Sequence, residues 1–201
     1  MNIKDEITAI VLAGGESSRM GRDKALLKIN RDTLLARICA IALQTTSKVC
    51  VVTPWVEKYQ SILPPDCQLI KEELVLKAKS NTPIIGFTQA LQSVDTEWVL
   101  LLACDLPYLS SFQVKQWSKS LATVLSTEIA LLPRNFKGWE ALCGFYRRDS
   151  LTSLKTYIES GGMSFQRWLS QHSVRELKIQ DRTCLFNCNT PADWQSVVDR
   201  R

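Results

Sequence analysis

Hydrophobic and polar positions along the chain follow two alternating patterns, one typical of strands and the other typical of helices. Residues 9–14 and 98–104 are short apolar runs, as expected of strands that are buried on both faces. Residues 33–44 instead repeat apolar side chains every three or four positions, which indicates an amphipathic helix. This alternation predicts an α/β fold of three layers, α/β/α, in which helices cover both faces of a mainly parallel sheet.

The same patterns continue to the end of the chain. Further strands are expected at residues 48–53, 128–133, 141–147 and 185–187, and further helices at residues 83–94, 112–125, 150–160 and 191–199. Pro83 and Pro191 stand where the first turn of a helix accepts proline, while Gly161 stands where a helix ends. No repeat or linker-like shift in composition interrupts the pattern, so we expect one domain over residues 1–201.

The composition is that of an ordinary folded chain. Hydrophobic residues make up 45% and charged residues 22%, which argues against disorder, and the longest apolar run is far too short to span a membrane. The first residues lack the pattern of a secretion signal, so a cytoplasmic location is expected. The 25 basic and 20 acidic side chains give a net charge of +5 without a run of like charges, which favours a solvated surface or a small anionic substrate over nucleic acid.

A glycine-rich, cationic loop follows the first predicted strand. In a parallel sheet, ligands bind beyond the carboxyl ends of the strands, and residues 12–24, LAGGESSRMGRDK, leave such an end. Gly14 and Gly15 allow backbone amides to approach a ligand closely. The loop continues with three cationic side chains that can neutralise a polyphosphate: Arg19, Arg22 and Lys24. The glycine spacing fits neither the Walker nor the Rossmann dinucleotide motif, and a turn with solvated charges is the alternative interpretation.

Asp105 is the second feature with candidate chemistry. It ends the apolar strand at residues 98–105, so its carboxylate is expected at the same sheet edge as the loop. A single carboxylate with open water positions is a common way to hold Mg²⁺ on nucleotide phosphates. A turn aspartate or a helix cap before Pro107 is the alternative. Together, the loop and the carboxylate predict the transfer of a nucleotidyl or phosphoryl group, driven mainly by binding and charge neutralisation.

These motifs resemble those of the nucleotidyltransferases that activate sugar phosphates, isoprenoid precursors and the molybdenum cofactor. LAGGESSRMGRDKALL (residues 12–27) is similar to their signature, and ACDLPYL (residues 103–109) is similar to their metal-binding segment. LFNCNTPADW (residues 185–194) resembles the NxNTP element of the molybdenum cofactor guanylyltransferase family in particular, which the sugar-nucleotide enzymes generally lack. The resemblance implies a Rossmann-like α/β/α fold of the nucleotide-diphospho-sugar transferase type.

The family resemblance also implies a reaction and its participants. It implies the transfer of GMP from GTP to molybdenum-molybdopterin, with Mg²⁺ as cofactor and with molybdopterin guanine dinucleotide and pyrophosphate as products. Other proteins of molybdenum cofactor biosynthesis and the recipient molybdoenzymes are further expected partners, whereas nucleic acid and membranes are not. The alternatives are a related enzyme that uses CTP or a sugar-1-phosphate acceptor, and a non-catalytic protein that binds a nucleotide or cofactor.

Roles for individual residues in nucleotide binding follow from the same resemblance. The nucleotide would be contacted through backbone groups of Leu12, Ala13, Gly14 and Gly15. Arg19 and Lys24 would hold the triphosphate, and Asp105 would bind the nucleotide through Mg²⁺. Lys24, Arg19 and Asp105 are therefore the expected catalytic residues, and Lys24 is the side chain expected to stabilise the charge of the leaving pyrophosphate.

The base-binding segment departs from the family pattern. The family usually has an aspartate after the third strand, followed by glycines, but this chain reads LIKEELVLKAKSN at residues 69–81. Glu72 or Glu73 would have to replace the aspartate with a side chain that is one methylene longer. A carboxylate at this position would recognise guanine by accepting hydrogen bonds from its N1 and N2 donors.

Asn187 and Asn189 are the expected acceptor-binding residues. They alternate along what reads as the end of a strand, so both are predicted to face the same side. Their amides can hydrogen-bond a pterin edge or a phosphate. The alternative is that both asparagines only shape the turn into the last helix.

Overall fold

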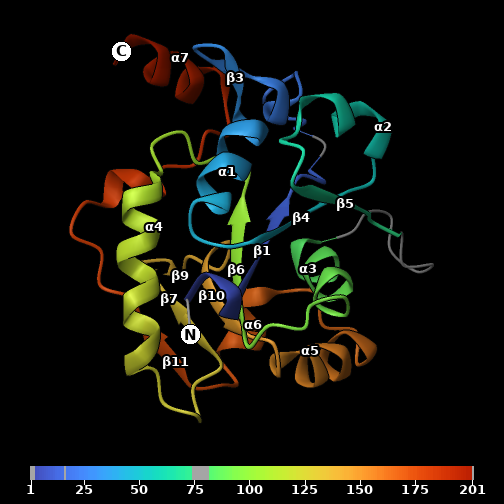
Figure 1. Ribbon diagram of the computed structural model, residues 1–201, viewed down its shortest axis with the longest axis vertical. Coiled ribbons are helices and arrows are strands. Elements are labelled where there is room, and N and C mark those ends of the chain that lie inside the picture. Colours follow the sequence, from blue (N-terminus) through green and yellow to red (C-terminus); the bar gives the residue numbers. More distant parts are fainter. Residues whose placement is uncertain (1–2, 16, 74–81, 201) are drawn as a thin grey trace.

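A seven-stranded sheet forms the centre of the molecule in the computed structural model, which describes residues 3–15, 17–73 and 82–200 (Figure 1). Its strands, in their order across the sheet, are β11 (Val174–Glu176), β7 (Ala130–Leu132), β10 (Cys143–Arg147), β6 (Trp98–Ala103), β1 (Ile7–Leu12), β4 (Lys48–Thr53) and β5 (Cys67–Lys71). Strand β10 runs antiparallel to β6 and β7, and the other pairs are parallel. The predicted mainly parallel sheet is therefore confirmed.

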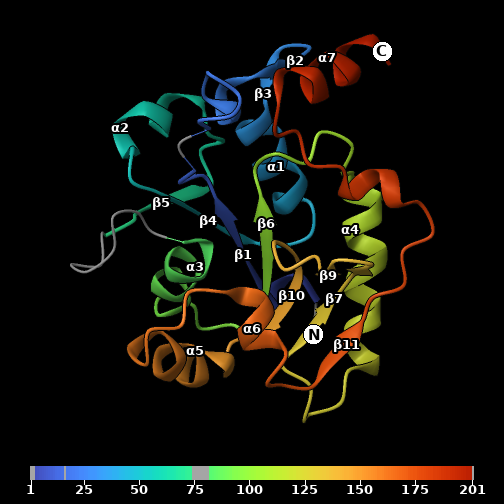
Figure 2. The same ribbon diagram turned by 180° about the vertical axis from the view of Figure 1, so that it is seen from behind.

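Helices cover both faces of this sheet (Figure 2). One face packs against α1 (Leu34–Leu43), α2 (Val56–Tyr59) and α4 (Ser111–Ser118), and the other packs against α3 (Pro83–Leu91), α5 (Ser150–Glu159) and α6 (Phe165–Leu169). Successive side chains of a strand point to opposite faces, so Ala9 and Val11 of β1 enter the first core and Ile10 enters the second. This is the three-layer α/β/α arrangement that the sequence predicts.

The last helix, α7 (Pro191–Asp199), packs beside residues 20–34 rather than on the sheet. It shares a small apolar cluster with the hairpin of β2 (Lys28–Ile29) and β3 (Asp32–Thr33), and Figure 1 shows α7 and β3 at the same end of the molecule. A second hairpin is formed by β8 (Arg134–Asn135) and β9 (Gly138–Trp139). None of the helices in the described part of the chain has the length and apolar character to cross a bilayer.

The register of the central strands decides where the chain can build a site. Leu12, the last residue of β1, pairs with Ala103, the last residue of β6, and with Val52 near the end of β4. Because these strands are parallel, the segments that follow them leave the sheet side by side at one edge. The glycine-rich loop after Leu12 and the carboxylate of Asp105 therefore start from neighbouring positions.

Two of the predicted elements differ in the structure. The strand predicted at residues 185–187 is wrong, because Leu185 ends a 3-10 helix (Arg182–Leu185) that Asp181 caps by accepting a hydrogen bond from the Thr183 N–H. That cap turns the backbone away from an extended path. The helix predicted at residues 112–125 divides into α4 and a 3-10 helix (Lys119–Thr123).

Candidate functional site

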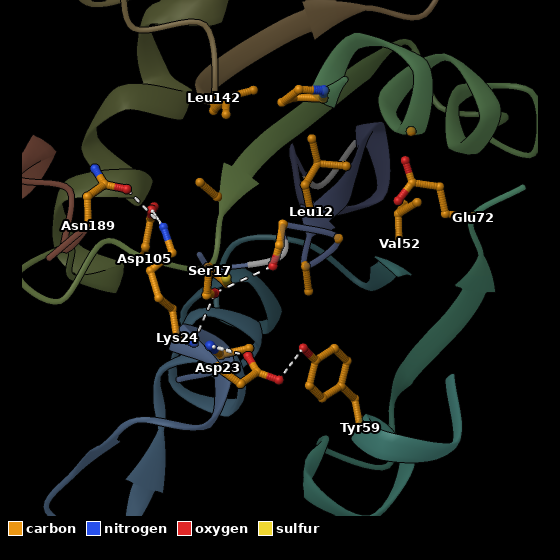
Figure 3. A pocket seen from close by; sticks show the side chains of 18 of the residues that line it. Leu12, Ser17, Asp23, Lys24, Val52, Tyr59, Glu72, Asp105, Leu142 and Asn189 are labelled. Carbon is orange, nitrogen blue, oxygen red and sulfur yellow. Dashed lines mark hydrogen bonds and ion pairs between the residues drawn. The ribbon is translucent and has the colours of Figure 1, made fainter. Parts of the chain in front are cut away.

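A cavity of about 320 Å³ lies at the carboxyl ends of β1 and β6 (Figure 3). Among the residues predicted to bind nucleotide, metal or acceptor, those that line it are Leu12, Ala13, Gly14, Gly15, Arg19, Lys24, Glu72, Asp105 and Asn189. The lining also includes Ser17, Asp23 and Tyr59, for which the sequence suggested no role. Glu73 and Asn187 are not among the lining residues. The glycine-rich loop, the end of β6 and the segment before α7 thus meet in one place.

The ammonium of Lys24 joins these segments. Its Nζ donates hydrogen bonds to Oδ2 of Asp105 at 2.8 Å and to Oδ1 of Asn189 at 2.9 Å (Figure 3). The side chains of Lys24 and Asp105 are only 16% and 12% exposed, so water screens their attraction less than it would at an open surface. Lys24 is therefore held at the wall of the cavity with its charge directed at a carboxylate and an amide oxygen.

The loop between β1 and Lys24 is held by local hydrogen bonds. Ser17 has a positive φ of 51°, and its Oγ accepts a hydrogen bond from the Lys24 N–H at 3.2 Å. Gly21, with a φ of +69°, closes a turn whose N–H bonds to the Ser17 carbonyl. Asp23 then caps the 3-10 helix Lys24–Leu26 by accepting a hydrogen bond from the Ala25 N–H. The backbone of Lys24 is thus fixed on both sides by short-range contacts.

Asp105 offers one carboxylate oxygen to a ligand. Oδ2 accepts the hydrogen bond from Lys24, whereas Oδ1 is buried and has no hydrogen-bond partner in the described part of the chain. Groups of three or more potential metal ligands are absent among the described residues. The neighbouring Cys104 thiol stays protonated, because burial and the Asp105 charge raise its pKa to about 12. The donor set therefore fits a hard cation that takes one protein carboxylate and completes its shell with phosphate oxygens and water.

Of the two predicted glutamates, Glu72 is the one that lines the cavity. Its carboxylate lies between two glycines: a Cβ added at Gly14 would lie 2.4 Å from Oε2, and one added at Gly86 would lie 2.9 Å from Oε1. Both positions therefore have to lack a side chain for Glu72 to lie as it does. Glu73 is tied to α3 instead, because its backbone N–H and carbonyl both bond to the Gln89 amide. Residues 74–81, which include the lysines in place of the family's glycines, lie outside the described residues.

The two predicted asparagines do not share an environment. The Nδ2 of Asn187 donates locally to the Leu185 carbonyl at 3.2 Å, whereas Asn189 reaches Lys24. The expectation that both alternate along a strand is wrong, since the backbone here leaves a 3-10 helix and enters the cap of α7. Asp193 accepts hydrogen bonds from the Asn189 and Thr190 N–H groups, and these bonds lower the pKa of its carboxyl. The cap of α7 thus holds Asn189 at the cavity.

The two arginines of the loop differ in their position. Arg19 is exposed and lines the cavity, and its positive charge contributes to the lowered pKa of Asp193. Arg22 is also exposed but lines a separate hollow next to Trp194. Only Arg19 can therefore face a ligand in the cavity together with Lys24.

Comparison with known proteins links this chain to one family. A family model described as "MobA-like NTP transferase domain" matches residues 9–176, a range that contains Lys24, Glu72 and Asp105. A protein of Nostoc sp. strain PCC 7120, named a probable molybdenum cofactor guanylyltransferase, is 49% identical over 189 residues, which cover 94% of this chain and 89% of that protein. A protein of the same name from Synechococcus elongatus is 38% identical over 189 residues and is covered to 96%.

The fold is also similar to that of a solved structure. The chain matches the crystal structure of molybdopterin-guanine dinucleotide biosynthesis protein A from Archaeoglobus fulgidus with a TM-score of 0.77 and 19% identity. The match covers 96% of this chain and 97% of that chain. At this identity the likeness concerns the fold alone, and it confirms the nucleotidyltransferase type of the predicted α/β/α fold.

Proposed function

This chain belongs to the MobA-like NTP transferase domain family, a family of nucleotidyltransferases, and we propose from this premise that it transfers GMP from GTP to molybdenum-molybdopterin. The relatives named molybdenum cofactor guanylyltransferase support this pair of substrates. The observation that carries the proposal is the contact of the Lys24 ammonium with both Asp105 and Asn189, because it joins three separate motifs in one cavity. We further propose that residues 1–201 act as one nucleotidyltransferase domain.

In the proposed reaction, an oxygen of the molybdopterin phosphate attacks the α-phosphorus of GTP. A new P–O bond forms there, and the bond from the α-phosphorus to the oxygen that bridges to the β-phosphate breaks. Pyrophosphate leaves with the electron pair of that bond, and molybdopterin guanine dinucleotide remains. A phosphate monoester has a second pKa of about 6 and is mostly ionised at neutral pH. No side chain therefore has to remove a proton, and the protein acts by orienting the reactants and stabilising charge.

Lys24 and Arg19 are the proposed triphosphate-binding side chains. The ammonium of Lys24 is a compact charge that is already oriented by Asp105 and Asn189, so it requires little rearrangement to stabilise a leaving pyrophosphate. Arg19, exposed at the same cavity, offers a planar guanidinium that can bind phosphate through two parallel hydrogen bonds. The two cations together would neutralise much of the triphosphate charge.

Asp105 is the proposed ligand of Mg²⁺. The fit rests on its buried Oδ1, which has no hydrogen-bond partner among the described residues, and on the partly buried position of the carboxylate at the cavity wall. When bound, Mg²⁺ supplies Lewis-acid stabilisation of the negative charge on phosphate oxygens. Asp105 would hold the ion beside the Lys24 ammonium, which bonds to the other carboxylate oxygen.

The glycine-rich loop and Glu72 are proposed to bind the nucleoside. Leu12, Ala13, Gly14 and Gly15 line the cavity next to the end of β1 and would contact the nucleoside through their backbone groups. The Glu72 carboxylate accepts hydrogen bonds only, and guanine presents two adjacent donors at N1 and N2. A carboxylate beside Gly14 therefore supports a preference for guanine.

Incubation of the purified protein with Mg²⁺, molybdenum-molybdopterin and GTP or CTP tests the proposed function. We expect pyrophosphate and molybdopterin guanine dinucleotide with GTP, and a rate at least about a hundredfold lower with CTP, because a mismatched base leaves buried polar groups unpaired. Equal or faster turnover of CTP would contradict the choice of guanine. Binding of GTP without pyrophosphate release from any nucleoside triphosphate would favour a non-catalytic binding protein, and product from a sugar 1-phosphate would favour the other acceptor class.

Replacing Glu72 by glutamine should weaken the preference for guanine. We expect kcat/KM for GTP to fall about fiftyfold, because one charged hydrogen bond is lost and an amide donor then faces a guanine donor. With ITP, whose base lacks the N2 amino group, the loss should be only about tenfold, since one donor fewer is mismatched. Glu73→Gln is the matched control, because Glu73 carries the same change on the outside of the cavity. Equal effects of the two variants on GTP would exclude Glu72 from base recognition.

Asn187 and Asn189 provide a second matched pair. Asn189→Ala should lower kcat/KM for molybdopterin about twentyfold, because a partner of the Lys24 ammonium and a cavity-lining amide are lost together. Asn187→Ala removes only a local bond to the Leu185 carbonyl and should change kcat/KM less than about threefold. Initial rates at varied molybdopterin measure both. A larger loss for Asn187→Ala would contradict the proposed role of Asn189 and would assign the acceptor contact to Asn187.

A further inference from the structure

Tyr59 is a buried tyrosine at the edge of the cavity that no sequence motif singled out. It ends α2, the four-residue helix after β4, and its side chain is 1% exposed. Its hydroxyl donates a hydrogen bond of 2.8 Å to Oδ2 of Asp23, in the loop that precedes Lys24 (Figure 3). Burial and this carboxylate raise the pKa of the phenol above its usual value, so the hydroxyl keeps its proton and remains a donor.

Asp23 connects this tyrosine to the catalytic loop. One of its oxygens, Oδ1, caps the 3-10 helix Lys24–Leu26 by accepting from the Ala25 N–H, while Oδ2 accepts from Tyr59 and pairs with the Lys58 ammonium. The Lys58 ammonium also lies 5.5 Å from the centre of the Trp55 ring, and this cation–π contact helps to hold it beside α2. Asp23 thus links the start of the 3-10 helix that carries Lys24 to α2. The Tyr59–Asp23 pair is separated by 36 positions in sequence.

The position of the Lys24 backbone limits where its ammonium can reach. Lysine has a long, flexible side chain, and its cation is useful only where it can meet both Asp105 and the phosphate charge. A shift of the first turn of the 3-10 helix would move Nζ away from Asp105 and Asn189, to which it now bonds at 2.8 and 2.9 Å. Displacements of about 1 Å in a reacting site are costly even when their cause lies away from the chemistry.

We propose that Tyr59 is a positioning residue for Lys24, which it holds in place through Asp23. This inference rests on the proposed function, in which Lys24 stabilises the charge on the leaving pyrophosphate. In the described part of the chain, the Tyr59 hydroxyl bonds to Asp23 and not to Asp105 or Asn189, so it acts on the reaction through the helix cap. Through Asp23, α2 is thus connected to the loop that carries the catalytic lysine.

Two tyrosine variants separate positioning from plain stability. Tyr59→Phe removes one buried hydroxyl and keeps the ring. Tyr146→Phe is the matched control, because Tyr146 is also fully buried and donates to a single acceptor, the Ala141 carbonyl at 2.7 Å, in the core on the other face of the sheet. We expect kcat to fall about tenfold for Tyr59→Phe, with KM for GTP within about threefold, and kcat within about twofold for Tyr146→Phe. Equal losses in the two variants would overturn the proposal.

A double-mutant cycle tests the route through Lys24. In a Lys24→Gln background, Tyr59→Phe should change kcat less than about twofold, because there is no ammonium left to position. If Tyr59→Phe still costs about tenfold in that background, the tyrosine acts by another route and the proposal fails.

A spectroscopic readout keeps the inference testable apart from the reaction. In protein labelled with ¹³C-lysine, the Hε–Cε signal of Lys24 is assigned by its loss in Lys24→Gln. We expect Tyr59→Phe to shift this signal towards those of solvent-exposed lysines and Tyr146→Phe to leave it in place. An unmoved signal in Tyr59→Phe would overturn the positioning role. Absence of pyrophosphate release by the wild type, with a shifted signal in Tyr59→Phe, would instead count against the proposed function alone.

Discussion

Asp105→Asn is expected to lower pyrophosphate release on the order of a thousandfold at saturating GTP and molybdopterin, as is typical when one preorganised electrostatic group is removed from a reacting site. The amide keeps the size of the carboxylate and can still accept a hydrogen bond from Lys24, so the cavity should keep its shape. It has no charge for a divalent cation, however, and Oδ1 is the buried oxygen that lacks a hydrogen-bond partner in the described part of the chain. The loss should therefore appear mainly in kcat.

The metal itself gives a second measurement of the same prediction. With GTP present, binding of Mn²⁺ to the wild type, followed by electron paramagnetic resonance, should be clearly tighter than binding to Asp105→Asn. Asp149→Asn, a change of the same kind at an exposed position ahead of α5, should leave both the rate and the binding of Mn²⁺ within about twofold. Unchanged pyrophosphate release in Asp105→Asn would remove the carboxylate from the mechanism.

The position of Asp105 beside the loop was predictable because it follows from strand geometry. Two apolar runs that read as buried parallel strands must end at the same sheet edge, and the pairing of Leu12 with Ala103 realises this. The same rule could not say that Lys24, rather than Arg19 or Arg22, bonds to Asp105. That choice depends on the turn at Ser17 and on the cap at Asp23, which are set by side-chain contacts and not by periodicity.

Contacts between distant segments account for most of what the sequence did not reveal. No sequence pattern around Tyr59 indicates a role for it. Its proposed role depends on a hydrogen bond to Asp23, which forms only when α2 packs beside the loop. The edge strand β11 is three residues long, too short for a pattern of period two to be recognised. Residues 185–187 look like a strand in the sequence because Leu185 and Phe186 are adjacent apolar residues, but the Asp181 cap sets the backbone conformation instead.

The structure selects Glu72 from the two glutamates that the sequence offered as base-binding residues. From the sequence, Glu72 and Glu73 were equal candidates, because either could replace the family's aspartate. Adjacent residues on an extended segment point to opposite sides, so only one of them is expected to face the cavity. The glycines at positions 14 and 86 leave room on one side only, and Glu72 occupies it. The second of those glycines belongs to α3, so this helix helps to create the space that Glu72 fills.

Lys24→Gln should produce two opposite changes. Pyrophosphate release is expected to fall about several hundredfold, because the oriented charge that stabilises the leaving group is lost. Binding of Mn²⁺ in the absence of nucleotide is expected to tighten about fivefold. In the wild type, the ammonium lies 2.8 Å from Oδ2 of Asp105, so it would repel a metal ion held by the same carboxylate. Two unit charges 4 Å apart repel by about 1 kcal/mol even in water, which corresponds to that factor.

This pair of changes separates a catalytic lysine from one that only supports the fold. A lysine that merely stabilised the cavity would, on removal, weaken both catalysis and metal binding. Lys115→Gln is the matched control, because the Lys115 ammonium bonds to Gln44 on the exposed side of α4 and α1, and both measurements should stay within about twofold. Lys24→Arg keeps the charge but not the compact ammonium, so it should repel Mn²⁺ like the wild type while recovering only part of the rate. Weaker Mn²⁺ binding in Lys24→Gln would mean that the lysine assembles the metal site instead of repelling the ion.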